Sequence, residues 1–265
     1  MSLTWVLERE VFPNGDCIRT GAVEAGHHVL DWREEWSASA ARPELVGPVL
    51  FHGSLSVADR IARERWWTPG AYCDAGAFHC SAWYPRAEEW LLNRRWEILP
   101  AAQLVRERDL VLDRLGTGDA VFVRPDSPLK PFSGRVLTRD RVTLAALDHG
   151  FYYDDPYLPV VVAPLRVVLR EWRYVVSANR VIAGSGYTAA TRAAIPDDPT
   201  GTPWRFAEDV SARLTGPETV YILDVCESDG GLHVLELNPF SGADLYACNG
   251  RDIVREVASI AAMAV

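Results

Sequence analysis

Short apolar runs alternate with amphipathic segments along the chain, and this alternation predicts a mixed α/β fold. In the first half, Pro48–His52 (PVLFH) reads as a buried strand, and the glycine turn after it leads into a helix over Val57–Trp67. A strand, a glycine turn and a helix in this order are typical of an α/β layer. Two more helical segments are expected over Glu88–Asn93 and Arg106–Leu115.

The second half is richer in β-branched residues and predicts a series of strands. Trp172–Ser177 and Arg180–Ser185 are separated only by Ala178 and Asn179, the spacing of a tight β-hairpin. Segment 192–204 is turn-rich and predicts a loop, either a lid over a ligand or a plain surface excursion. The other expected elements are strands over Ala120–Val123, Pro159–Val168, Thr219–Cys226 and Leu232–Leu237, and helices over Phe206–Leu214 and Asp252–Met263.

The most informative pattern is a pair of strands that carries acidic and amide side chains. Successive strand residues point to opposite faces, so Glu236 and Asn238 share one face. If the turn consists of residues 229–231, Asp224 lies opposite Glu236, whereas a four-residue turn shifts this register by one. Two carboxylates and an amide oxygen on one surface suit a hard cation such as Mg²⁺, although acids on a solvated hairpin face give the same pattern.

A basic strand and a flexible loop form a second candidate. Arg124 follows the apolar strand Ala120–Val123, and a charge at that position needs an anionic partner. The loop after it combines a cation, a hydroxyl and a glycine in Lys130, Ser133 and Gly134, a combination that cradles phosphates. A structural ion pair for Arg124 and an ordinary surface loop explain the same residues.

Two further segments have both a chemical and a structural interpretation. Glu171 and Arg173 share a strand face, where Arg173 either holds a phosphate or substrate carboxylate with its planar fork or only stabilises the sheet. The apolar run 160–165 is interrupted by Pro164 and offers the flat slot with exposed backbone groups that adenine requires. Most β-branched runs of this kind are simply core.

Composition and charge narrow the class of partner. The formal net charge of −9 and the pI near 5.2 repel a polyphosphate backbone, so nucleic acid is disfavoured as the main partner. No apolar stretch approaches the roughly 20 residues that cross a bilayer, and no signal peptide is recognisable, so we expect a cytoplasmic protein without a membrane partner. The cysteines form no C-x-x-C pair, which fits reduced thiols, and Cys73, His79 and Cys80 lack an obvious fourth ligand for zinc.

Taken in order, these segments resemble the ATP-grasp superfamily. The matching series is VFVRP, KPFSG, VVVAPL, EWRYVVSANRVIAGSGY and ILDVCES followed by LHVLELNPFSGAD, and it covers roughly residues 106–265. The order of five motifs is far more specific than any one of them. The resemblance implies an α/β (α+β) ATP-grasp fold over residues 106–265, with two subdomains clasping a nucleotide, preceded by a small α/β domain over residues 1–105.

The resemblance also implies a role for each candidate residue. The magnesium ligands are matched by Asp224, Glu236 and Asn238, and the first phosphate-binding lysine is replaced by Arg124. The loop that closes over the triphosphate is matched by Lys130, Ser133 and Gly134, and the adenine hinge by Val162, Ala163, Pro164 and Leu165. Near the ribose or hinge falls Glu171, and near phosphate or substrate falls Arg173. The candidate catalytic cations are therefore Arg124, Lys130 and Arg173.

The implied activity is that of an ATP- and Mg²⁺-dependent ligase, which joins a small-molecule or peptide carboxylate to an amine or another nucleophile through an acyl phosphate. A kinase that phosphorylates a hydroxyl, and a nucleotide-binding module without turnover, are alternatives that use the same kind of site. Arginine in place of lysine at position 124 departs from the family pattern, because a planar fork is not equivalent to a point charge. Related enzymes are often dimers, so a homodimer is compatible with the resemblance.

Overall fold

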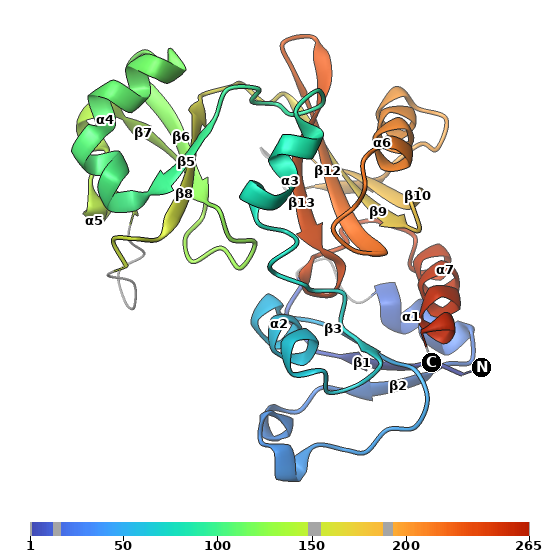
Figure 1. The fold of residues 1–265 in the computed structure, drawn as a ribbon. Coiled ribbons are helices and arrows are strands. Elements are labelled where there is room, and N and C mark those ends of the chain that lie inside the picture. Colours follow the sequence, from blue (N-terminus) through green and yellow to red (C-terminus); the bar gives the residue numbers. More distant parts are fainter. Residues whose placement is uncertain (1, 13–16, 148–154, 188–192, 265) are drawn as a thin grey trace. The chain divides into compact units, whose positions relative to one another are not determined.

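The computed structural model describes residues 2–12, 17–147, 155–187 and 193–264. The chain divides into two compact units (Figure 1). Unit 1 is Met1–Asp74 with Leu169–Val265, and unit 2 is Ala75–Val168. Both units contain helices and strands, which confirms the predicted mixed α/β class. Among the described residues, no helix is long and apolar enough to cross a membrane.

Unit 1 contains two sheets. The first is parallel, in the order β2-β1-β3-β4, and the second is antiparallel, in the order β11-β10-β9-β12-β13. The first half of the unit comprises β1 (Thr4–Leu7), α1 (Cys17–Glu24), β2 (His28–Asp31), β3 (Val49–His52), α2 (Leu55–Glu64) and β4 (Pro69–Gly70). The second half comprises β9 (Arg170–Ser177), β10 (Arg180–Tyr187), β11 (Ala194–Pro196), α6 (Thr202–Arg213), β12 (Val220–Ser228), β13 (Gly231–Pro239) and α7 (Gly250–Met263).

Helices cover both faces of the antiparallel sheet. The core between this sheet, α1 and α7 includes Val175, and α6 covers the opposite face, where Trp204 packs edge-on against Tyr174. The helices α1 and α7 approach so closely that a Cβ at Gly21 would lie 2.7 Å from the backbone oxygen of Gly250. Because side chains alternate along a strand, residues on the same face as Val175 belong to the α7 side of the sheet.

Unit 2 is a smaller antiparallel sheet with helices packed on it. It comprises α3 (Cys80–Ala87), β5 (Glu97–Pro100), α4 (Ala101–Leu115), β6 (Ala120–Pro125), β7 (Arg135–Thr138), α5 (Leu144–Leu147) and β8 (Pro159–Pro164). The strand order is β5-β8-β6-β7, and Leu104 and Val111 of α4 share a buried core with Val121 and Val162 of the sheet. The division into units follows packing contacts and does not test the boundary near residue 105, which stays a prediction.

A buried carboxylate fixes the start of α3 in unit 2. Asp126 lies just after β6 and accepts hydrogen bonds from the backbone N–H and the hydroxyl of Ser81, at 2.7 and 2.9 Å. His79 Nδ1 lies 3.2 Å from Asp126 Oδ2, and it donates because an ionised carboxylate only accepts. Asp126 therefore caps this helix from a distant segment, because N–H groups of a first turn have no partner within their own helix.

The predicted hairpin between β9 and β10 is confirmed. Ala178 and Asn179 have φ values of 48° and 61°, as a two-residue turn with a left-handed backbone requires. The predicted helix over Arg106–Leu115 is present but begins earlier, at Ala101, and deviates from helical geometry at Glu107. Periodicity therefore located these elements better than it located their ends.

Three predicted elements need correction. Residues 88–93 are not helical, because α3 ends at Ala87 and the chain continues in turns. The strand expected to reach Val168 ends at Pro164, whose ring removes a backbone donor from the ladder. The described part of segment 192–204 is not a single loop, because β11 pairs with β10 and α6 begins at Thr202.

One acid of unit 1 is buried in an unfavourable environment. Glu218 lies between α6 and β12, and its Oε2 atom is buried with no hydrogen-bond partner among the described residues. Burial raises the pKa of Glu218 to about 8, while the backbone N–H of Asp74 lowers it and the Asp74 charge raises it, both less strongly than burial. Because the carboxyl titrates near 4.5 in water, only the folded protein retains this proton between the two pKa values.

We therefore expect Glu218→Gln to raise the free energy of unfolding by about 2 to 3 kcal/mol at pH 9 and to change it little at pH 4. The folded pKa lies above the unfolded one, so the wild type loses stability as pH rises from about 4.5 to 8. Urea unfolding at pH 4, 7 and 9 measures the difference, with Glu44→Gln as an exposed control. An equal effect at all three pH values would contradict the buried-proton explanation.

Candidate functional site

The structure places the predicted acids on adjacent strands of unit 1. Asp224 on β12 pairs in register with Glu236 on β13 and with Arg173 on β9. The predicted opposition of Asp224 and Glu236 is thus confirmed, although the turn between the strands is only residues 229–230. A β-bulge at Leu235 shifts the register by one residue and brings Glu236 opposite Asp224.

Arg173 is held by a network of charged and polar contacts. Its Nε and Nη2 atoms each donate to one Asp224 carboxylate oxygen at 2.8 Å, and Nη1 donates to the backbone oxygen of Asp244 at 2.7 Å. The guanidinium also lies over the Tyr246 ring, 4.6 Å from its centroid. Burial opposes the charge of Arg173, but the Asp224 carboxylate outweighs it, so the pKa of Arg173 lies above its ordinary value. A permanent positive charge is therefore fixed beside the acids.

Asn238 completes the set of oxygen donors. Its Nδ2 atom donates to Asp224 Oδ2 at 2.9 Å, so its amide oxygen is directed away from that carboxylate. Asp224 has about four lone-pair positions and can accept these bonds while still sharing an oxygen with a cation. No group of three His, Cys, Asp or Glu residues within the described chain could hold a metal, so the amide of Asn238 is needed as a third ligand beside Asp224 and Glu236. Two carboxylates and one amide oxygen fit a hard cation such as Mg²⁺.

The rim of this face contains an acid and two tyrosines. Glu171 pairs in register with Tyr187, and its pKa is raised by burial and, to a smaller extent, by the Asp224 charge. The Tyr187 ring stacks on Tyr246 at 4.9 Å with an interplanar angle of 6°. Neither tyrosine was predicted. Tyr187 could have been found by extending the β9–β10 register, whereas Tyr246 lies in a loop that carries no such signal.

Unit 2 places the predicted basic strand beside the predicted loop. Arg124 on β6 pairs with Val161 on β8. A Cβ at Gly134 would lie 2.7 Å from the Phe122 ring and 3.7 Å from Arg124 Cβ, so the loop lies directly on this face of the strand. The buried Phe132 side chain anchors the loop in the core of the unit. Only a glycine fits this close approach at position 134.

The other predicted residues of unit 2 differ in exposure. Lys130 and Ser133 are exposed, and Lys130 has a left-handed backbone with φ 50°. The Val162 side chain packs into the core, so only its backbone can reach a ligand, whereas Ala163 shares the face of Arg124. Leu165 follows the end of β8 and is 45% exposed.

The structure therefore gathers the predicted residues into two groups, one in each unit. The group in unit 1 is Glu171, Arg173, Asp224, Glu236 and Asn238. The group in unit 2 is Arg124, Gly134 and Ala163, with Lys130, Ser133, Pro164 and Leu165 on the adjoining loop and strand end. Val161 was not predicted by name, although strand alternation already places it on the face opposite Val162.

Comparisons with known proteins identify this arrangement. Structures similar to the whole chain include D-cycloserine synthetase DcsG, with a TM-score of 0.62, 13% identity and coverage of 98% of this chain and 100% of that chain. A RimK domain ATP-grasp protein from Sphaerobacter thermophilus has a TM-score of 0.62 and 14% identity, covering 99% of this chain and 97% of that one. The ATP-grasp ligase PsnB, complexed with a precursor variant, Mg and ADP, has a TM-score of 0.59 and 15% identity, covering 98% and 99%.

These identities are low, so the similarities establish the fold. No curated protein matches the sequence. A protein-family model, which describes an ATP-grasp domain and is the second family of its clade, matches residues 105–255. Because this match spans more than half of the sequence, the chain belongs to this family of ATP-grasp domains, which confirms the resemblance seen in its motifs.

Proposed function

We propose that the chain is an ATP- and Mg²⁺-dependent ligase that activates a carboxylate as an acyl phosphate and transfers the acyl group to an amine. The observation that carries this proposal is the in-register set of Arg173, Asp224, Glu236 and Asn238 on one sheet face. Membership of the ATP-grasp family and similarity to a synthetase and a peptide-precursor ligase support it.

The acids and the arginine of unit 1 have complementary roles in this proposal. Asp224, Glu236 and the amide oxygen of Asn238 would hold Mg²⁺, which when bound offsets the negative charge of the transferring phosphate. Arg173 balances the negative charge of Asp224 and keeps that carboxylate in place. Its guanidinium has five N–H donors, and the three contacts already described leave others to face a phosphate or carboxylate oxygen.

The residues of unit 2 would bind the rest of the nucleotide. Arg124 presents a bidentate fork, Lys130 a point charge, and the Ser133–Gly134 backbone its N–H groups toward phosphate oxygens. Val161 and Ala163 offer an apolar strand surface on the same face as Arg124, which suits adenine. Each preorganised charge of this kind is typically worth about 3 kcal/mol in a reaction barrier.

The reaction then needs no protein nucleophile. A carboxylate oxygen of the substrate attacks the γ-phosphorus, the bond from that phosphorus to the bridging oxygen breaks, and ADP leaves. An amine next attacks the acyl carbon, phosphate leaves, and the amine loses its proton to solvent. The positive charge of Arg173, Arg124 and Lys130 stabilises the developing phosphate charge in the first step.

An isotope experiment tests this chemistry. The full chain is incubated with ATP, Mg²⁺ and a panel of amino acids and short peptides whose carboxylates carry ¹⁸O. We expect ADP together with inorganic phosphate that has gained one ¹⁸O atom, because the acyl phosphate passes a substrate oxygen to phosphate. ADP with an acid-stable phosphoester would instead indicate a kinase. ADP with unlabelled phosphate, or no ADP at all, would contradict the ligase.

A further inference from the structure

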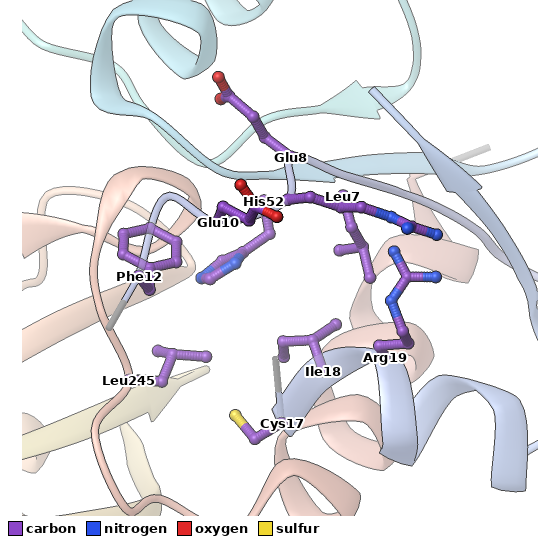
Figure 2. Close-up of a pocket in the computed structure, with 10 residues that line it drawn as sticks. Leu7, Glu8, Glu10, Phe12, Cys17, Ile18, Arg19, His52 and Leu245 are labelled. Atoms are coloured by element: carbon purple, nitrogen blue, oxygen red, sulfur yellow. The ribbon is translucent and has the colours of Figure 1, made fainter. Parts of the chain in front are cut away.

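A cavity separate from the acids described above lies at the edge of the parallel sheet of unit 1. Its volume is about 490 Å³, and it opens where β1 ends at Leu7 and β3 ends at His52 (Figure 2). The chain leaves β1 toward β2 on one side, while β3 lies on the other side, so the strand order reverses at this point. In α/β sheets, ligands bind outside the carboxyl ends of strands at such a reversal.

The floor and one wall of the cavity are apolar. Leu7, Phe12, Ile18 and Leu245 line it, and the cavity is large enough for a small organic ligand. The buried His52 ring is fixed behind this surface, with its Nε2 atom 3.1 Å from the backbone oxygen of Ala243. The apolar lining is therefore backed by ordered structure and suits a hydrophobic side chain.

Two arginines supply a positive side. In Figure 2, Arg19 and Phe12 lie on opposite sides of the cavity, and Glu10 and His52 lie between them. Arg9 Nη2 lies 2.6 Å from an oxygen of Asp31, and Arg19 bonds to the other oxygen of the same carboxylate. A guanidinium has five N–H donors, so sharing one carboxylate leaves both arginines with further donor capacity. This side of the cavity suits a carboxylate.

A glutamate supplies the negative charge. Glu10 is exposed at the cavity, and its carboxylate has no hydrogen bond or ion pair to any described residue. Its backbone is left-handed, with φ 61°, a conformation that side chains other than those of Asn and Asp rarely adopt. Such local strain is often found where a side chain has to be aimed at a ligand. The neighbouring Glu8 accepts the Ser54 N–H at 2.7 Å and adds to the negative potential.

We propose that this cavity binds a free α-amino acid with an apolar side chain. Glu10 contacts the ammonium group, Arg9 and Arg19 contact the carboxylate, and the apolar floor receives the side chain. A nucleotide phosphate fits less well, because Glu8 and Glu10 would repel it. If the chain is the ligase proposed above, this amino acid is one of its two substrates. The binding itself does not depend on that activity.

The single partly exposed cysteine of the described chain gives a direct readout. Cys17 lines the cavity, whereas Cys73, Cys80, Cys226 and Cys248 are buried. The rate of Cys17 alkylation by iodoacetamide, followed by peptide mass spectrometry without ATP, therefore reports occupancy. We expect saturating leucine or phenylalanine to slow this alkylation by about fivefold or more, because burial of a thiol limits its reactivity. Aspartate, N-acetyl-leucine and leucine methyl ester should protect far less.

Matched variants test the charged contacts. We expect Glu10→Gln to raise the leucine concentration needed for half-protection by about fivefold, as loss of an exposed ion pair predicts. Glu44→Gln, which removes an exposed acid outside the cavity, should leave it unchanged. No protection by any apolar amino acid, equal protection by N-acetyl-leucine, or an unaltered Glu10→Gln variant would each overturn the proposal. Protection without any ATP-dependent turnover would leave the cavity assignment standing and refute the ligase.

Discussion

Replacing Glu236 by glutamine should lower ATP-dependent turnover by about a hundredfold to a thousandfold without unfolding the protein. The substitution keeps the size of the side chain but removes the charge that faces Asp224 across β12 and β13. Glu236 is only half-buried and β13 is an edge strand, so the fold does not depend on this charge. The loss should therefore appear in turnover and in the Mg²⁺ concentration needed for half-maximal rate, and not in the urea midpoint.

The measurement is ADP release with the most active substrate pair from the labelled panel, over a range of Mg²⁺ concentrations. Glu227→Gln is the matched control, because Glu227 is an acid on β12 whose side chain points to the face opposite Asp224. This control should retain wild-type turnover. Full turnover in the Glu236→Gln variant would remove Glu236 from the site and would leave too few oxygen ligands for the proposed Mg²⁺ site.

The sequence predicts best those parts of the fold that depend on neighbouring residues. The β12–β13 hairpin was visible because its strands are consecutive and joined by a glycine turn, so alternation alone placed Glu236 and Asn238 on one face. The register was predicted from a three-residue turn, whereas the structure reaches it with a two-residue turn and a bulge at Leu235. A bulge depends on the twist and packing of the whole sheet, which a local pattern does not contain.

The parts that were missed depend on segments that are distant in sequence. Arg173 and Asp224 are 51 residues apart and meet because β9 pairs with β12, a strand order that the sequence leaves open. Tyr246 reaches Arg173 from a loop after the last strand. The cavity of unit 1 is similarly non-local, because it joins the ends of β1 and β3 to Leu245. Candidate chemistry was therefore predictable by residue type, but the partners that control its charge were not.

Replacing Arg173 by methionine should lower the free energy of unfolding by about 3 kcal/mol or more, because it leaves the Asp224 carboxylate buried without its counter-charge. The two side chains are only 12% and 10% exposed and share two hydrogen bonds, so solvent cannot replace the lost partner. Turnover should also fall, since a fixed positive charge is lost from the site. Arg173→Lys should keep more stability than methionine, but lysine cannot reproduce the two-pronged contact with Asp224.

A double-mutant cycle separates the structural role of Arg173 from its role in the site. Asp224→Asn removes the charge that methionine leaves unpaired, so the Arg173→Met/Asp224→Asn double variant should recover about 2 kcal/mol of the stability lost by Arg173→Met alone. Turnover should stay at the level of the weaker single variant, because neutralising the pair restores packing but supplies neither a cation nor a carboxylate ligand. Urea unfolding and ADP release on the same four proteins give both quantities. Recovery of turnover together with stability would mean that the pair only supports the sheet, as the structural interpretation of Glu171 and Arg173 requires.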